Sequence, residues 1–130
     1  MRIGFGRSDL TPRVGVELAG FGAFINRHSV GVRDRLWARA MAIEAADGEA
    51  AVIVGLDLCV IYRETTERVC ELLHEATGVP PERVMVNCTH THSGPETGGL
   101  IGWGFGEGTA HPVVHKQVVK LRIWSQPDLF

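Results

Sequence analysis

Cysteine is scarce in this sequence, and no two cysteines form a C-x-x-C pair. Cys59, Cys70 and Cys88 are the three present, and they follow no regular spacing. An odd number of cysteines without such spacing argues against a disulfide framework and indicates a reducing compartment. Each is therefore expected to be a small buried hydrophobic residue. Cys88 differs from the other two because it lies two residues before a histidine.

A strong charge of either sign is also missing. Thirteen basic and fifteen acidic residues give a net charge of −2, and no block of like charges occurs. The short basic segment HKQVVKLR near the end carries no aromatic residues on which bases could stack. These features argue against a DNA- or RNA-binding role, and we expect no nucleic-acid partner.

Long hydrophobic runs are absent as well. The longest, AAVIVGLDLCVI, is interrupted by Asp57 and is too short to cross a bilayer, so no transmembrane segment is expected. Glycines and charges interrupt the start, MRIGFGRSDLTP, which is therefore not a signal peptide. With 130 residues, 45% of them hydrophobic, the chain is expected to be a globular domain with a cytoplasmic location.

The first half of the sequence predicts strands. Residues 2–8 are expected to form a short strand, and residues 33–46 alternate in a way that favours a second one. Asp47-Gly48 is a turn signal, and the β-branched run of residues 50–58 follows it. The last two strands are expected to form a hairpin in which the run at 50–58 is buried on both faces.

The second half predicts a helix followed by another strand. Residues 64–77 place apolar side chains at steps of three and four, and residues 83–89 are a further buried strand. A strand, a helix and a strand in this order imply a right-handed crossover with parallel pairing. The predicted fold class is α/β: a mixed sheet with an antiparallel N-terminal portion and a βαβ crossover. Residues 94–108 are expected to form a glycine-rich loop, and His111-Pro112 the start of a last helix.

The segment VNCTHTHSGPETGG, residues 86–99, contains the candidate site. His90 and His92 come directly after a predicted buried strand, where ligands of open α/β sheets bind. On extended backbone they would point to the same side, about 6.5 Å apart along the chain. Such a pair suits either metal ligation or proton transfer. Ser93 and Gly94 then turn the chain and keep its backbone close to the site.

An H-x-H pair alone is common by chance, and the other histidines are weaker candidates. His74 is expected to be solvated on the polar side of its helix, and His28 carries no signal of its own. His111 and His115 are four residues apart, a spacing that can bind a metal on a helix, although an exposed helix start is favoured.

Five segments, in order, resemble the neutral/alkaline (non-lysosomal) ceramidase family, in its N-terminal catalytic domain. THTHSGP after an apolar strand is similar to that family's signature. The likeness covers roughly residues 3–99 and includes GFGRSDLTP at 4–12 (family G-x-G-R-x-D-I/L-T), AGFG at 19–22 (M-x-G-Y/F), GVRDRLWARAMAI at 31–43 (G-I-x-x-R-L-x-A-R-A) and VGLDL at 54–58 (a strand ending in Asp-Leu).

The resemblance implies a zinc-dependent amidase that cleaves the N-acyl bond of a ceramide-like lipid. It implies His90 as a zinc ligand and His92 as a catalytic residue beside the metal. Water activated by zinc would attack the amide carbonyl while an imidazole protonates the departing amine. Asp57, at a strand end, would orient a histidine through a hydrogen bond. Aromatic residues in the loops are the candidates for lining a lipid groove: Phe21, Phe24, Trp103 and Phe105.

The family's other zinc ligands, a second His, a Glu and a Tyr, come from regions downstream of this motif. Here SGPGG is altered to SGPETGG, and the final stretch keeps a loose likeness. Residues 1–110 are therefore expected to be a partial ceramidase-like catalytic domain, part of a larger one. Residues 111–130 are expected to be a divergent tail, from a truncated or frameshifted reading frame.

Three alternatives stay open. The chain could be a non-catalytic remnant, or a metal-binding fragment that depends on a partner for the missing ligands. His111, His115 or Glu96 could instead complete a site within the chain. In a different H-x-H metallohydrolase, both His90 and His92 would bind the metal.

Overall fold

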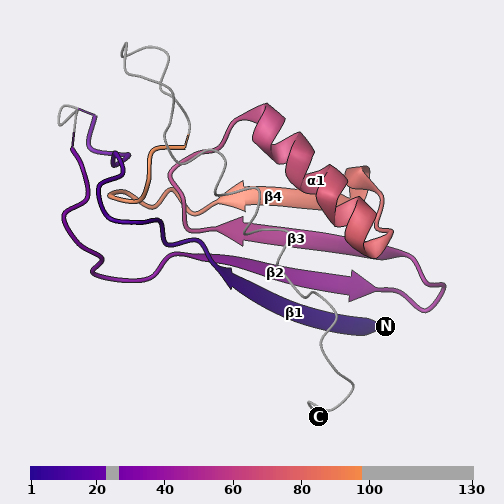
Figure 1. The fold of residues 1–130 in the computed structure, drawn as a ribbon. Coiled ribbons are helices and arrows are strands. Elements are labelled where there is room, and N and C mark those ends of the chain that lie inside the picture. The colour runs from indigo at the N-terminus through magenta and orange to yellow at the C-terminus, as the bar shows by residue number, and fades with distance from the viewer. Residues whose placement is uncertain (23–26, 98–130) are drawn as a thin grey trace.

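The structure is a computed structural model that describes residues 1–22 and 27–97. Four strands form one sheet in the order of the sequence (Figure 1). Their bounds are β1 Arg2–Asp9, β2 Trp37–Glu44, β3 Ala50–Leu56 and β4 Val84–Cys88. The pairs β1–β2 and β2–β3 are antiparallel, and β3–β4 is parallel. The predicted mixed sheet with an antiparallel N-terminal portion is confirmed.

The predicted hairpin and crossover are both present. β2 and β3 join through a tight turn in which the Ala45 N–H donates to the Glu49 carbonyl at 2.8 Å. Gly48 in that turn has a φ of 88°, a conformation that glycine adopts without steric cost. Helix α1, Arg63–Thr77, and the 3-10 turn η1, Pro81–Arg83, connect β3 to β4. The helix ends where Gly78 takes a left-handed conformation, and its N–H donates to the His74 carbonyl at 2.8 Å.

Helix α1 covers one face of the sheet, and the core lies between them (Figure 1). Alternate residues of β2 and β3 point to this face because successive strand side chains point in opposite directions. Val69 and Leu73 of the helix pack against them. All of the following are at most 4% exposed: Ala38, Ala40, Ala42, Val52, Val54 and Leu56.

The opposite face of the sheet is apolar and open among the described residues. Phe5 on β1 is 66% exposed and Met85 on β4 is 54% exposed. Ile53 on β3 is half-buried, so the expectation that this strand is buried on both faces is wrong within residues 1–22 and 27–97. A β-branched run indicates that both faces suit burial, whereas actual burial needs a second layer to pack there.

Three loops leave the sheet at one edge. Because β1, β3 and β4 run in the same direction, their carboxyl ends meet there (Figure 1). The candidate histidines follow β4 at this edge.

The remaining expectations lie beyond these elements. In the described ranges, no helix is long and apolar enough to cross a membrane. The expected helix at His111, the far part of the glycine-rich loop and the boundary at residue 110 lie outside the described residues. The cytoplasmic location stays a prediction.

Candidate functional site

Backbone hydrogen bonds hold together the loops that follow β1, β3 and β4. The loop after β4 continues the ladder with β3, since Thr89 N–H donates to the Leu56 carbonyl at 2.9 Å. Farther along, Ser93 N–H donates to the Ala19 carbonyl and Ala19 N–H donates to the Gly94 carbonyl, both at 2.9 Å. The segment after β1, which the sequence indicates only as a loop, therefore pairs with the histidine motif.

The backbone of the motif is not extended, contrary to the prediction. β4 ends at Cys88, and both His90 and Ser93 have left-handed backbones, with φ values of 59° and 60°. Non-glycine residues adopt this conformation rarely. The reversals bring the chain back toward Ala19, and the two rings still meet, with centroids of His90 and His92 4.9 Å apart. The predicted convergence is observed, but turns produce it in place of strand alternation.

His90 is oriented by the loop that follows β3. Its Nδ1 lies 3.1 Å from the Cys59 carbonyl oxygen and 3.6 Å from the Cys59 Sγ. When Nδ1 carries the proton and donates it to that carbonyl, Nε2 keeps a free lone pair. This is the arrangement by which backbone carbonyls fix the ring of a metal-binding histidine.

His92 packs directly on the backbone of Gly20. A Cβ built on Gly20 would lie 2.5 Å from the His92 ring, and Gly20 has a φ of 86°, so two constraints favour glycine there. The ring of Phe21 contacts the His92 ring edge-on, with centroids 4.8 Å apart. The predicted role of Phe21 in a groove is therefore replaced, among the described residues, by a contact with the histidine.

Arg27 is a residue of the site that the sequence analysis missed. Its guanidinium donates to the Ser93 Oγ and to the carbonyls of Ala19 and Gly20, each at 3.1 Å. It also lies over the Phe21 ring, 5.3 Å from the centroid. A single arginine in a loop gives no signal in the sequence, since its partners come from another segment.

Asp57 lies at the same edge, but its carboxylate faces β2. It accepts hydrogen bonds from the Trp37 N–H at 2.9 Å and from Arg39 at 2.8 Å. Its hydrogen bonds in the described part of the chain go to these partners, so the expected contact with a histidine is wrong there. The reason is strand alternation: Asp57 projects to the open side of the sheet with Arg39.

Three potential metal ligands gather where the loops after β3 and β4 meet. The Cys59 sulfur and one ring nitrogen each of His90 and His92 all lie within 4.8 Å of one another. Burial, and next the negative charge of Glu96, raise the pKa of the Cys59 thiol. Thiolate and imidazole are ligands that zinc prefers, so the donor set fits such an ion.

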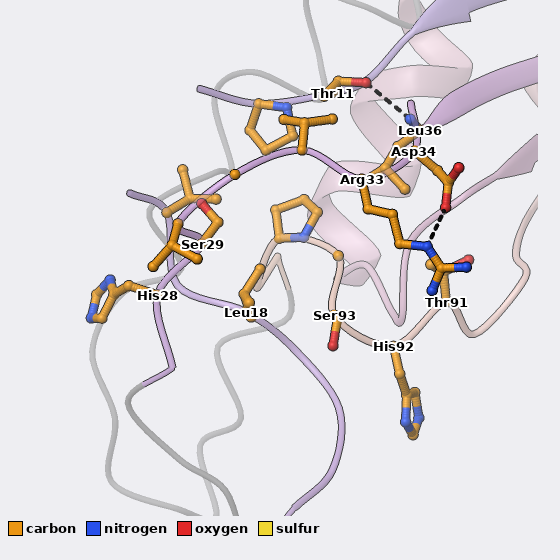
Figure 2. A pocket seen from close by; sticks show the side chains of 17 residues that line it. Thr11, Leu18, His28, Ser29, Arg33, Asp34, Leu36, Thr91, His92 and Ser93 are labelled. Atoms are coloured by element: carbon orange, nitrogen blue, oxygen red, sulfur yellow. Dashed lines mark hydrogen bonds and ion pairs between the residues drawn. The ribbon is translucent and has the colours of Figure 1, made fainter. Parts of the chain in front are cut away.

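A pocket of about 390 Å³ lies beside His92 (Figure 2). Figure 2 shows the His92 and Ser93 side chains extending from their loop at one end of it and His28 at the other. The lining combines apolar residues with polar ones: Thr11, Pro12, Val16, Leu18, His28, Ser29, Val30, Gly31, Val32, Arg33, Asp34, Leu36, Thr91, His92, Ser93, Gly94 and Pro95. Its volume is within the range of small-molecule sites.

The other candidates are remote from this cluster or lie outside the described residues. His74 is exposed on α1, as predicted, with its Nδ1 3.1 Å from the Val79 carbonyl oxygen. Glu96 is buried, and its N–H donates to the Glu17 carbonyl. The residues outside the described ranges are Phe24, Trp103, Phe105, His111 and His115.

Known proteins resemble the chain in sequence. Residues 1–102 match the family described as neutral/alkaline non-lysosomal ceramidase, N-terminal. A neutral ceramidase of Pseudomonas aeruginosa is 38% identical over 98 residues, which are 72% of this chain and 14% of that protein. Neutral ceramidase 2 of Arabidopsis thaliana is 33% identical over 96 residues, 72% of this chain and 12% of that protein. The chain thus spans about one seventh of the length of these relatives.

The fold leads to the same family. The crystal structure of neutral ceramidase from Pseudomonas aeruginosa superposes with a TM-score of 0.73 and 32% identity. The superposition covers 90% of this chain and 20% of that structure, so the four-stranded sheet and its helix correspond to a fragment of a larger domain. This protein belongs to the neutral/alkaline non-lysosomal ceramidase family and corresponds to its N-terminal region.

Proposed function

We propose that the chain is the N-terminal part of a zinc-dependent amide hydrolase that cleaves the N-acyl bond of a ceramide-like lipid. Family membership and relatives named neutral ceramidases support the reaction class. The observation that carries the proposal is the convergence of the His90 and His92 rings at the carboxyl ends of the strands, on a backbone with two left-handed residues. Strained backbone of this kind concentrates at functional sites.

In this proposal His90 binds the metal through Nε2. Its Nδ1 is held by the Cys59 carbonyl, which fixes the ring and makes Nε2 the nitrogen that faces the ion. When bound, zinc supplies a Lewis acid that polarises an amide carbonyl and lowers the pKa of water toward about 7.

His92 is the proposed proton donor. Its ring lies beside that of His90, and contacts with Gly20 and Phe21 restrict its position. A protonated imidazole there hydrogen-bonds the developing charge and gives its proton to the nitrogen of the departing amine. Ser93 and Gly94 act on the substrate side by holding the backbone close to the site.

The pocket beside His92 supports an apolar substrate. Pro12, Val16, Leu18 and Leu36 provide an apolar wall, and His92 stands at one end of the pocket. This arrangement suits an alkyl chain whose amide group lies next to the histidines. A ceramide-like lipid has that form, and one of the similar solved structures is a ceramidase complexed with C2.

The alternative is a non-catalytic metal-binding fragment that depends on a partner. Coverage of 14% of a relative's length favours it, because a catalytic zinc has three protein ligands and the family draws the others from downstream. In both cases the missing part of the catalytic domain is the expected partner.

Zinc content and ceramide hydrolysis separate these possibilities. We expect near-stoichiometric zinc in the purified chain, lost in His90→Ala and retained in His74→Ala, whose histidine is exposed on α1. Release of fatty acid from a ceramide that falls at least about 100-fold in His92→Ala, with zinc retained, would support catalysis by the chain. Zinc without hydrolysis would support the fragment. Zinc content that is equal in wild type and His90→Ala would contradict both.

A further inference from the structure

Cys59 differs from the other two cysteines in its surroundings. Cys70 is buried in α1, and Cys88 packs against the hydrophobic core between sheet and helix. Cys59 is half-buried and does not belong to that core. Its side chain faces the imidazole of His90, with the Sγ 3.6 Å from Nδ1. The sequence expectation of a buried hydrophobic residue therefore does not describe this cysteine.

The backbone holds Cys59 and His90 side by side. Beyond the ends of β3 and β4, Thr89 N–H donates to the Leu56 carbonyl at 2.9 Å, and Thr91 N–H donates to the Leu58 carbonyl at 3.1 Å. These bonds flank the two residues along the chain. The Cys59 carbonyl also accepts from the His90 ring, which adds a third constraint. The thiol and the imidazole are thus positioned by the sheet, not by chance contact of mobile side chains.

The spacing of the donor atoms suits coordination after a small movement. Donors of a tetrahedral zinc site lie about 3.3–3.8 Å apart, given zinc–nitrogen and zinc–sulfur bonds of about 2.1 and 2.3 Å. Those of Cys59, His90 and His92 lie within 4.8 Å of one another, so a shift of about 1 Å is needed. His90 is exposed and can make that shift by rotating its side chain.

We propose that Cys59 supplies a thiolate ligand to the divalent cation that His90 binds, which makes this site selective for thiophilic ions such as zinc and cobalt. The S–H bond breaks and a sulfur–metal bond forms, and the proton passes to solvent. His92 stays beside the ion as proton donor. This inference rests on the proposed function, because it concerns the metal at His90.

Cobalt is a spectroscopic probe for the sulfur. We expect the full chain titrated with Co²⁺ to develop a thiolate-to-cobalt charge-transfer band in the near ultraviolet and the visible absorption of bound Co²⁺. Cys59→Ser should abolish the near-ultraviolet band. Cys88→Ser, which removes a neighbouring thiol that packs on the core, should keep it.

A measurement on the wild-type chain removes any dependence on how the variants fold. Alkylation of each cysteine, followed by mass spectrometry, should slow at least about tenfold at Cys59 when zinc is added, since a metal-bound thiolate is a poorer nucleophile. Alkylation of Cys88 should be unchanged.

The outcomes separate this inference from the proposed function. Visible cobalt absorption that needs His90 but shows no charge-transfer band would overturn the role of Cys59 and leave the metal at His90 in place. Equal bands in wild type and Cys59→Ser would do the same. Absence of any bound cobalt or zinc would overturn both.

Discussion

The layer of sheet and helix differs from the edge of the sheet where the loops meet. In the layer, strands and helix are regular, and side chains such as Val54 and Leu56 are fully buried. At the edge, the described non-glycine residues with positive φ gather, namely Phe21, His90 and Ser93. Polar groups, rings and a thiol make the contacts there. The difference teaches that the layer supplies the free energy of folding while the edge holds an unfavourable backbone for its chemistry.

Truncation of a core side chain should produce the largest effect and test the stabilising role of the layer. Leu56→Ala removes a fully buried side chain, and we expect it to lower the free energy of unfolding by about 2–5 kcal/mol. Met85→Ala, on the open face of the same sheet, should cost less than about 1 kcal/mol because its side chain is half exposed already. Urea denaturation of the full chain measures both. Equal losses would mean that the open face is covered, and the comparison would fail.

A substitution at Gly20 should have an intermediate effect on stability and a specific effect on the site. Gly20→Ala forces an L side chain into a φ of 86° and places a Cβ against the His92 ring. Gly15→Ala is its matched control, since Gly15 has a φ of 99° but nothing within 4 Å of the added atom. We expect each to cost about 1–2 kcal/mol from the backbone.

The two glycine variants should differ in the histidine signals. NMR should show the His92 ring resonances displaced in Gly20→Ala and unchanged in Gly15→Ala. Undisplaced His92 resonances in both would show that the ring is not held by Gly20, and the edge would then be less ordered than its contacts indicate.

Acid should have the smallest effect, acting where β1 enters the edge. Hydrogen bonds from Thr11, and then the Arg35 guanidinium, hold the pKa of Asp9 below its ordinary value of 3.8. A lowered pKa in the folded state stabilises the protein above the unfolded pKa, and this contribution is lost as the pH falls through the folded value. Asp9→Asn should therefore flatten slightly the acid limb of stability against pH. An unchanged slope below about pH 4 would show that the Thr11 contact does not persist in solution.

Much of the regular structure was predictable because its causes are local. Alternation identified β2, spacing of three and four identified α1, and Asp47-Gly48 identified the hairpin turn. The order of strand, helix and strand then required parallel pairing of β3 with β4. The resemblance of the segments around His90 identified the family.

The contacts of the site were decided by tertiary structure. The sequence by itself determined which residues form strands and helix, and that two histidines follow a buried strand. It did not determine the left-handed backbone at His90, the seat of His92 on Gly20, or the position of Cys59 against His90. Each of these depends on segments distant in the sequence that meet at one edge of the sheet. Side-chain periodicity reports the surroundings of a single element, whereas a site formed by three loops exists only after the strands have paired.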